Sequence, residues 1–275
     1  MHSSRRAAGR GCYRGCEDAP TGLRSQHYRT GSTLETIRAR GTITDMSPSE
    51  SDQESALLAR LRSMVLPERG GALSERFRAR RWEEFYRRFP QLPDMSVIDL
   101  GGYAWNWVNV PVRPKAVLVV NLDKKPPADA PDWIETVRAD ACELPSEIFD
   151  RTFDLAYSNS LIEHVGGYSR RVSIAGAVNR LAEHHWVQTP SRYFPIEPHW
   201  VFPGFQFLPL RVRAEVSHYW PLSSPELRAE SVEKNIDRVL TVELVSVTEM
   251  RRLFPRSEIY RERFAGLTKS IAAVL

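Results

Sequence analysis

Acidic residues and glycines follow short apolar runs of this sequence at a spacing that suits a nucleoside-like ligand. The run that begins at Ser96 has Asp99 near its end and leads into Gly101 and Gly102. Because glycine permits positive φ and has no Cβ, such a turn allows bare backbone to approach a ligand. Asp123 ends the second run, 22 residues after Gly101. A doubly wound fold places an acid there to accept hydrogen bonds from ribose hydroxyls, and the alternative role is the cap of a following helix.

Two further features indicate the kind of ligand, and the second of them argues against a dinucleotide. Asp140, with Ala141 after it, follows the third run, where its carboxylate would reach an adenine amino group or cap a helix. The glycine pair does not continue as G-x-G-x-x-G, and Tyr103 and Trp105 put bulky side chains where a pyrophosphate would need room. A nicotinamide cofactor is therefore disfavoured, and the pattern favours a nucleoside cofactor without phosphates.

The elements that must position these residues alternate between strands and helices. Apolar runs predict seven strands, at Ser96–Gly102, Val117–Asp123, Ile134–Asp140, Phe153–Ser158, His185–Gln188, Ser257–Phe264 and Thr268–Leu275. Helical spacing predicts helices at 50–66, Leu73–Phe89, Ser169–Glu183 and Thr248–Phe254. This alternation is typical of parallel βαβ units, and the short turn at Gly266 favours an antiparallel last pair. The predicted fold class is α/β: a doubly wound, Rossmann-like sheet of seven strands, mostly parallel, with an antiparallel C-terminal strand.

Two of the predicted helices have features that need a reason. The helix at 73–89 has aromatic residues on one side and arginines on the other, and we expect the basic face to be solvated. Gly176 lies inside the helix at 169–183, where glycine costs up to about 1 kcal/mol relative to alanine. Close packing of this helix on the sheet is the expected reason.

Composition divides the chain into three regions. Residues 1–45, rich in Arg, Ser, Gly and Thr, are predicted to be a disordered basic tail, with Met46 as an alternative start of the protein. Residues 46–92 are predicted to form N-terminal helices, and residues 93–275 the main domain. A Pro-rich and aromatic segment interrupts this domain at about 190–225. Its aromatic residues form either ordinary core or a lid over an apolar or lipid-linked acceptor.

Charge and cysteine content narrow the function classes. The tail holds eight arginines and four acids, which equals the net charge of +4, so the rest of the chain is neutral. This argues against a nucleic-acid binder, which needs a basic patch on its folded domain. Three cysteines do not make a disulfide framework, and Cys12 and Cys16 lack partner ligands, so we expect no metal site. No apolar run is long enough to span a membrane, and a cytoplasmic protein is expected; contact with a membrane surface and the oligomeric state stay open.

From about Met95 onward the chain resembles the class I S-adenosylmethionine-dependent methyltransferases, in particular the bacterial methyltransferase type 11 group. The matching pieces are VIDLGG at 97–102, NLD at 121–123, RADACELP at 138–145, FDLAYSNSLIEHV at 153–165, QTPSRYFPIEPHW at 188–200 and the final hairpin. The resemblance implies S-adenosylmethionine as the cofactor. It implies that Asp99, Gly101 and Gly102 flank the methionine part, that Asp123 holds the ribose, that Asp140 and Ala141 border the adenine, and that Ser158 and Asn159 close over the cofactor. The family's common D-x-G-x-G-x-G lacks its later glycines here.

The expected function is methyl transfer to a small-molecule or lipid-linked acceptor, with oxygen or carbon as the favoured acceptor atom. Candidates for removing a proton from the acceptor are His164, after the fourth strand, and Glu197 and His199 in the Pro-rich segment. Each has a structural alternative: His164 as a packed residue where Glu163-His164 opens a helix, His199 as core, and Glu197 as a partner of backbone amides. The competing function is a binding or scaffolding protein that retains the methyltransferase fold without catalysis.

Overall fold

The computed structural model describes residues 72–122 and 130–275 of the chain. The predicted tail at 1–45, the predicted helix at 50–66 and Asp123 lie outside the described residues. Within the described ranges, no helix has the length and apolar character required to cross a membrane.

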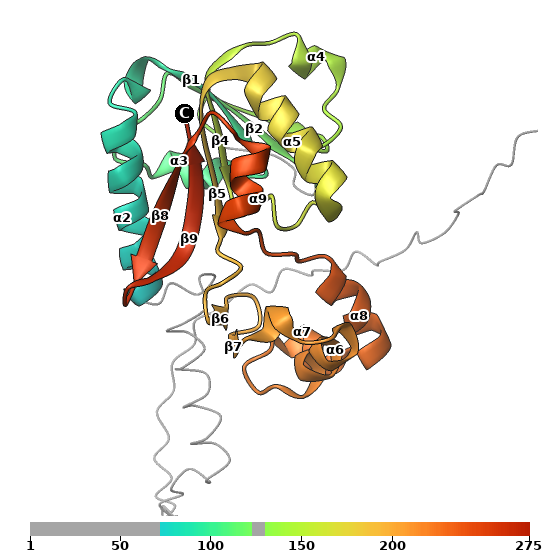
Figure 1. Ribbon diagram of the computed structural model, residues 1–275. Coiled ribbons are helices and arrows are strands. Elements are labelled where there is room, and N and C mark those ends of the chain that lie inside the picture. Colours follow the sequence, from blue (N-terminus) through green and yellow to red (C-terminus); the bar gives the residue numbers. More distant parts are fainter. Residues whose placement is uncertain (1–71, 123–129) are drawn as a thin grey trace, which may run out of the picture. The chain divides into compact units, whose positions relative to one another are not determined.

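A seven-stranded sheet forms the centre of the main domain (Figure 1). Its strands are β1 (Ser96–Leu100), β2 (Ala116–Asn121), β3 (Ile134–Arg138), β4 (Phe153–Asn159), β5 (Ala182–Pro190), β8 (Glu258–Phe264) and β9 (Leu267–Val274). The order is β3-β2-β1-β4-β5-β9-β8, and β1 to β5 pair in parallel. The last hairpin places β9 antiparallel between β5 and β8. The predicted fold class is confirmed, including the antiparallel C-terminal strand.

Alternate residues of β1 contribute to the two hydrophobic cores on opposite faces of the sheet. Ile98 and Leu100 belong to the core beneath α5 (Gly167–Leu181) and α9 (Val247–Leu253). Val97 points to the opposite face and packs in the core that α2 (Ala72–Arg88) and α3 (Ala104–Val108) cover. Alternate side chains of a strand lie on opposite faces, so a short apolar run fills two cores.

The helix after β4 differs from its prediction in two respects. It begins at Gly167 and ends at Leu181, and Ala182 and Glu183 are already part of β5. Gly176 does not pack closely on the sheet, because a Cβ at this position would meet no atom within 4 Å. The packing explanation for this glycine is therefore wrong.

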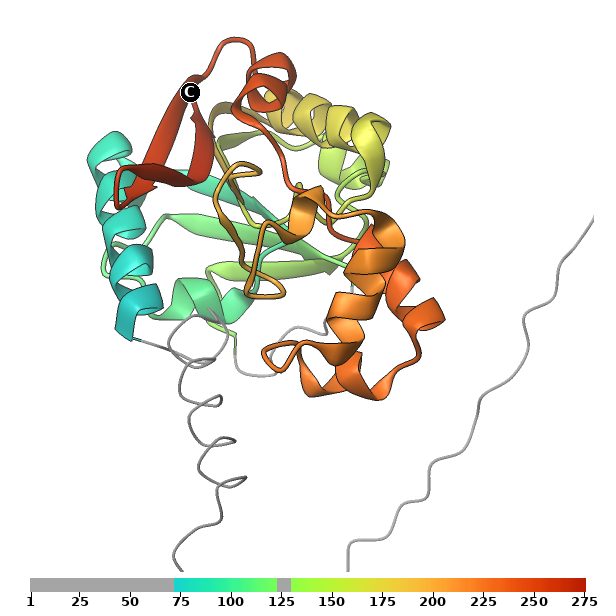
Figure 2. The ribbon, with the colours of Figure 1, turned by 60° about the horizontal axis from the view of Figure 1, so that its bottom comes forward.

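The segment after β5 is an insertion with a small core of its own. It contains the short strands β6 (Ile196–Glu197) and β7 (Phe202–Pro203), the 3-10 turn η3 (Phe205–Phe207), and the helices α6 (Leu210–Tyr219), α7 (Pro225–Ala229) and α8 (Val232–Leu240). Trp200 and Phe205 stack at 4.3 Å and lie in one buried cluster with Leu227 and Val239. By contrast, Tyr193 and Phe207 are mostly exposed. The insertion runs beyond 225, through three helices that the sequence analysis did not predict; in Figures 1 and 2 it is the orange region.

Both ends of the insertion are fixed to the main domain. The amide of Ser191 donates to the carbonyl of Lys269 of β9 at 3.0 Å, and Ser191 also pairs with Val245 in an isolated bridge. The amide of Glu243 donates to the carbonyl of Glu163 at 2.8 Å. Arg171 of α5, itself buried, donates to the side chain and the carbonyl of Glu243 and to the carboxylate of Glu249. The returning chain is thereby held beside the loop that follows β4.

Candidate functional site

The turn after β1 is built around a buried carboxyl group. Gly101 has φ +81°, and a side chain there would overlap Leu161. A Cβ at Gly102 would overlap the carboxylate of Asp99, which lies directly against this residue. Both glycines are therefore required by the protein's own packing, and the turn presents backbone without side chains.

Asp99 is fully buried and only half satisfied. Its Oδ2 accepts a hydrogen bond from Trp107 Nε1 at 2.7 Å, whereas Oδ1 has no hydrogen-bonding partner. Burial raises the pKa of Asp99 to about 7, and the bond from Trp107 opposes this shift. When ionised, a buried carboxyl group of this kind would strongly stabilise a positive charge placed next to it.

The bulky side chains that follow the glycines do not fill the turn. Trp105 is 61% exposed and stacks on Tyr103 with ring centroids 5.9 Å apart. Trp107, not Trp105, points into the core beneath the turn and binds Asp99.

The remaining predicted cofactor residues lie at the carboxyl ends of strands β3 and β4, on the same side of the sheet as the glycine turn. The polar side chains among them already have protein partners. Asp140 accepts from the amide of Cys142 and pairs with Arg170. Burial would raise the pKa of Asp140, but these two partners outweigh it and hold the pKa below its usual value. Ala141 is buried in the core on the α5 side, and Ser158 Oγ donates to the carbonyl of Leu100 at 3.0 Å.

Asn159 leads to a residue that the sequence analysis missed. Its Oδ1 accepts a 2.9 Å hydrogen bond from Arg81 of α2, which also donates to Gln188 of β5 and to Glu262 of β8. Arg81 lies four residues after Phe77 and four before Phe85, both of which are buried. An arginine on the apolar stripe of a helix was therefore the available signal. The predicted solvated face consists of Arg76, Arg80, Arg87 and Arg88 and does not include Arg81.

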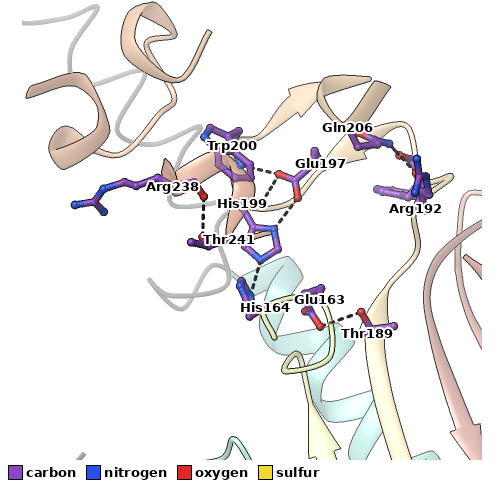
Figure 3. Close-up of polar contacts among 11 residues, drawn as sticks. Glu163, His164, Thr189, Arg192, Glu197, His199, Trp200, Gln206, Arg238 and Thr241 are labelled. Carbon is purple, nitrogen blue, oxygen red and sulfur yellow. Dashed lines mark hydrogen bonds and ion pairs between the residues drawn. The ribbon is translucent and has the colours of Figure 1, made fainter. Parts of the chain in front are cut away.

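Two of the predicted proton acceptors form a pair in the insertion, and the third faces them from the main domain (Figure 3). Glu197 is buried and accepts three bonds, from the amides of His199 and Trp200 and from His199 Nδ1 at 2.6 Å. His199 Nε2 lies 3.2 Å from His164 Nε2. Glu197 thus bonds backbone amides of its own loop, as the structural alternative expected, and in addition orients an imidazole toward the main domain.

His164 does not open a helix, as the sequence analysis considered, because α5 begins at Gly167 and residues 162–164 form a turn. Burial and the charge of His199 lower the pKa of His164 to about 4, although Glu197 and a hydrogen bond with the backbone of Thr241 raise it.

Glu163 is a second residue that the sequence analysis did not propose. It is fully buried; Oε2 accepts from Thr189 Oγ1 at 3.0 Å, and Oε1 has no hydrogen-bonding partner. One oxygen of Glu163 and one ring nitrogen each of His164 and His199 lie within 4.8 Å of one another. Burial raises the pKa of Glu163, whereas His199 and the hydroxyl of Thr189 lower it.

The strand order now separates this sheet from the dinucleotide-binding arrangement. That arrangement has the order 3-2-1-4-5-6, whereas here an antiparallel strand enters between β5 and the edge strand β8. This is the class I methyltransferase fold. The point at which the strand order reverses lies between β1 and β4, where the Gly101-Gly102 turn and Asn159 are placed.

No family model and no curated protein matches this chain. Solved structures do match. The chain is similar to the N-methyltransferase NodS of Bradyrhizobium japonicum in complex with S-adenosyl-L-homocysteine, with 10% identity, coverage of 72% of this chain and 86% of NodS, and a TM-score of 0.44. For an S-adenosylmethionine-dependent methyltransferase of Mesorhizobium loti the values are 18%, 70%, 95% and 0.43. For a protein of Rhodobacter sphaeroides described as a putative Zn-dependent alcohol dehydrogenase they are 13%, 71%, 87% and 0.49. These similarities concern the arrangement of strands and helices.

Proposed function

We propose that this protein transfers a methyl group from S-adenosylmethionine to a small-molecule or lipid-linked acceptor. The observation that carries the proposal is the side-chain-free turn at Gly101 and Gly102, placed where the strand order reverses. Ligands of open α/β sheets bind in the crevice at the carboxyl ends of the strands, at this reversal.

The described residues fit this cofactor at the turn. S-adenosylmethionine contains ribose, adenine and a positively charged sulfonium, and it has no phosphate. The unpartnered oxygen of Asp99 is a buried acceptor beneath the turn that a positive charge would stabilise. Trp105, the residue expected to crowd the site, is mostly exposed. The proposed roles of Asp123 at the ribose and of Asp140 and Ala141 at the adenine stay predictions.

The acceptor side is proposed to lie beyond β4 and β5, where the insertion places His199 opposite His164. Methyl transfer needs an in-line approach of the acceptor atom, and holding the two reactants in that geometry supplies much of the rate. The polar groups available to the acceptor on this side are imidazoles backed by a buried carboxylate, which suits an oxygen or carbon acid more than an apolar group.

Isothermal titration of the full chain with S-adenosylhomocysteine tests the cofactor. We expect saturable binding with one site per chain, and a weakening of about 1 to 3 kcal/mol in Asp123→Ala if charged ribose hydrogen bonds are lost. Asp132→Ala is the matched control, an acid in the same connection that should leave the affinity unchanged. A sample with a cooperative unfolding transition that does not bind S-adenosylhomocysteine would sink the proposal.

Turnover distinguishes the enzyme from a binding protein with the same fold. Extracts of cells with and without the protein are compared for metabolites that differ by one methyl group. A methylated product that depends on the protein supports the enzyme, whereas cofactor binding without any such product favours the non-catalytic alternative.

A further inference from the structure

We propose that Glu163, His164 and His199 bind a divalent transition-metal ion. The proposal rests on the placement of three ligand-type side chains and does not depend on methyl transfer. Figure 3 shows that they come from two segments, the loop after β4 and the insertion, that the rings of His164 and His199 point toward one another, and that the carboxylate of Glu163 beside them is bonded to Thr189. The ligand atoms all lie within 4.8 Å of one another.

The distance between the two imidazoles suits two ligands of one ion. Nitrogen ligands lie about 2.0–2.1 Å from such a metal, so two adjacent ligands are roughly 2.8–3.0 Å apart in octahedral geometry and roughly 3.3–3.4 Å apart in tetrahedral geometry. His164 Nε2 and His199 Nε2 are separated by 3.2 Å. The spacing therefore requires little rearrangement on binding.

The outer partner of His199 leaves a lone pair directed into this gap. His199 Nδ1 lies 2.6 Å from the carboxylate of Glu197, which can only accept, so the proton of a neutral His199 is on Nδ1. The Nε2 lone pair of a neutral His199 is then directed toward His164 Nε2, where a shared ion would lie.

Glu163 supplies the negative charge that a divalent ion needs. Its Oε1 is buried without a partner, and the hydroxyl of Thr189 holds the other oxygen at 3.0 Å. Leaving a buried carboxyl oxygen unpaired is unfavourable, and a metal ion would satisfy it.

The surroundings resemble those of metal sites in general. A carboxylate on the outer nitrogen of a ligating histidine fixes the ring and raises its basicity, and Glu197 has this position behind His199. Two imidazoles and one carboxylate suit zinc, manganese or iron better than magnesium, which prefers oxygen ligands. The surrounding chain desolvates the ring of His164, but the residue keeps access to solvent, so coordination positions on its side remain open to water or to an oxygen atom of a ligand.

The test is metal binding by the full chain, without an affinity tag, after treatment with a chelator. Zn²⁺ and Mn²⁺ are titrated by calorimetry, and bound Mn²⁺ is also followed by electron paramagnetic resonance; Mg²⁺ serves as the comparison ion. We expect one site that binds Zn²⁺ and Mn²⁺ more tightly than Mg²⁺. Glu163→Gln, His164→Ala and His199→Ala should each weaken it by more than about 100-fold, and Glu197→Gln by about 10- to 100-fold.

Matched controls separate this site from other ligands. His184→Ala removes an exposed histidine outside the cluster and should leave the affinity unchanged. Because residues before 72 include Cys12 and Cys16, the measured quantity is the difference between wild type and variant. Each variant is also titrated with S-adenosylhomocysteine, whose binding should persist, so that loss of metal and loss of cofactor are told apart. The proposal is overturned if folded wild type lacks such a site, or if the three variants bind metal as tightly as wild type does.

Discussion

Asp99 and Glu163 are two buried carboxyl groups that are alike in burial and in hydrogen bonding, but different groups surround them. Each side chain is fully buried, each has one oxygen that accepts a hydrogen bond from a neighbouring side chain, and each has one oxygen without a partner. Asp99 lies under a glycine turn, with the indole of Trp107 as its donor. Glu163 faces two imidazoles.

The difference indicates which kind of charge each group is suited to receive. The immediate surroundings of Asp99 contribute one neutral donor, so burial raises its pKa to about 7 and a positive charge must come from a ligand. Glu163 lies among groups that bind metal ions themselves, so its charge is matched by an ion held jointly with His164 and His199. A cofactor with one positive charge and a divalent metal are therefore proposed at separate places of the same fold.

The glycine turn over Asp99 provides the largest expected effect. In Gly102→Ala the new methyl group would overlap the Asp99 carboxylate, so we expect a loss of about 3 kcal/mol or more in the free energy of unfolding, measured in urea. The loss should be much smaller in an Asp99→Ala background, because the obstructing group is gone. An equal loss in both backgrounds would show that Asp99 does not form the floor of this turn.

Asp99 itself is expected to lower stability as the pH rises. Its pKa lies at about 7 in the folded state and near 3.8 in the unfolded state, so the folded state binds more protons between these values. Stability therefore falls as the pH rises from about 4 to about 7. Compared with Asp99→Asn, wild type should lose about 2.5 kcal/mol more between pH 5 and pH 8, measured by urea unfolding at each pH.

Asp154 is the matched control for this pH dependence. Its carboxylate accepts from the hydroxyl and the amide of Ser96, which lower its pKa. The contribution of Asp154 is thus complete above about pH 5 and is lost only as the pH falls through its unfolded value of about 3.8, so Asp154→Asn should leave the change between pH 5 and pH 8 unaltered. If Asp99→Asn changes stability equally at pH 5 and pH 8, Asp99 does not titrate in this range.

The strands of the main-domain sheet could be predicted because each strand is encoded by a short stretch of neighbouring residues. Alternating and continuous apolar runs predict strands, and a short turn at Gly266 predicts the final hairpin; the structure confirms both. The sequence also indicates that the two glycines allow a close approach to the backbone. In the structure, the groups that approach it are side chains of the protein itself: Leu161 lies against Gly101, and Asp99 lies against Gly102.

The cluster at Glu163 could not be predicted in the same way, because its members meet only in three dimensions. His164 and His199 are 35 residues apart in the sequence. His199 lies in the insertion, whose three helices were not predicted from the sequence. Arg81 was missed for a different reason: it lies on the apolar stripe of α2, where its spacing from Phe77 and Phe85 was the available clue.

Gly176 gives the smallest effect and tests whether the penalty at Gly102 comes from Asp99 or from replacing glycine as such. It lies within α5, is exposed, and a Cβ there would meet no atom within 4 Å. Gly176→Ala should therefore raise the free energy of unfolding by about 0.5 to 1 kcal/mol, because alanine loses less backbone entropy in a helix. Urea unfolding of the two glycine variants side by side measures the contrast. A loss of stability in Gly176→Ala would mean that α5 has a close neighbour at this position, and the penalty at Gly102 would then no longer single out the turn around Asp99.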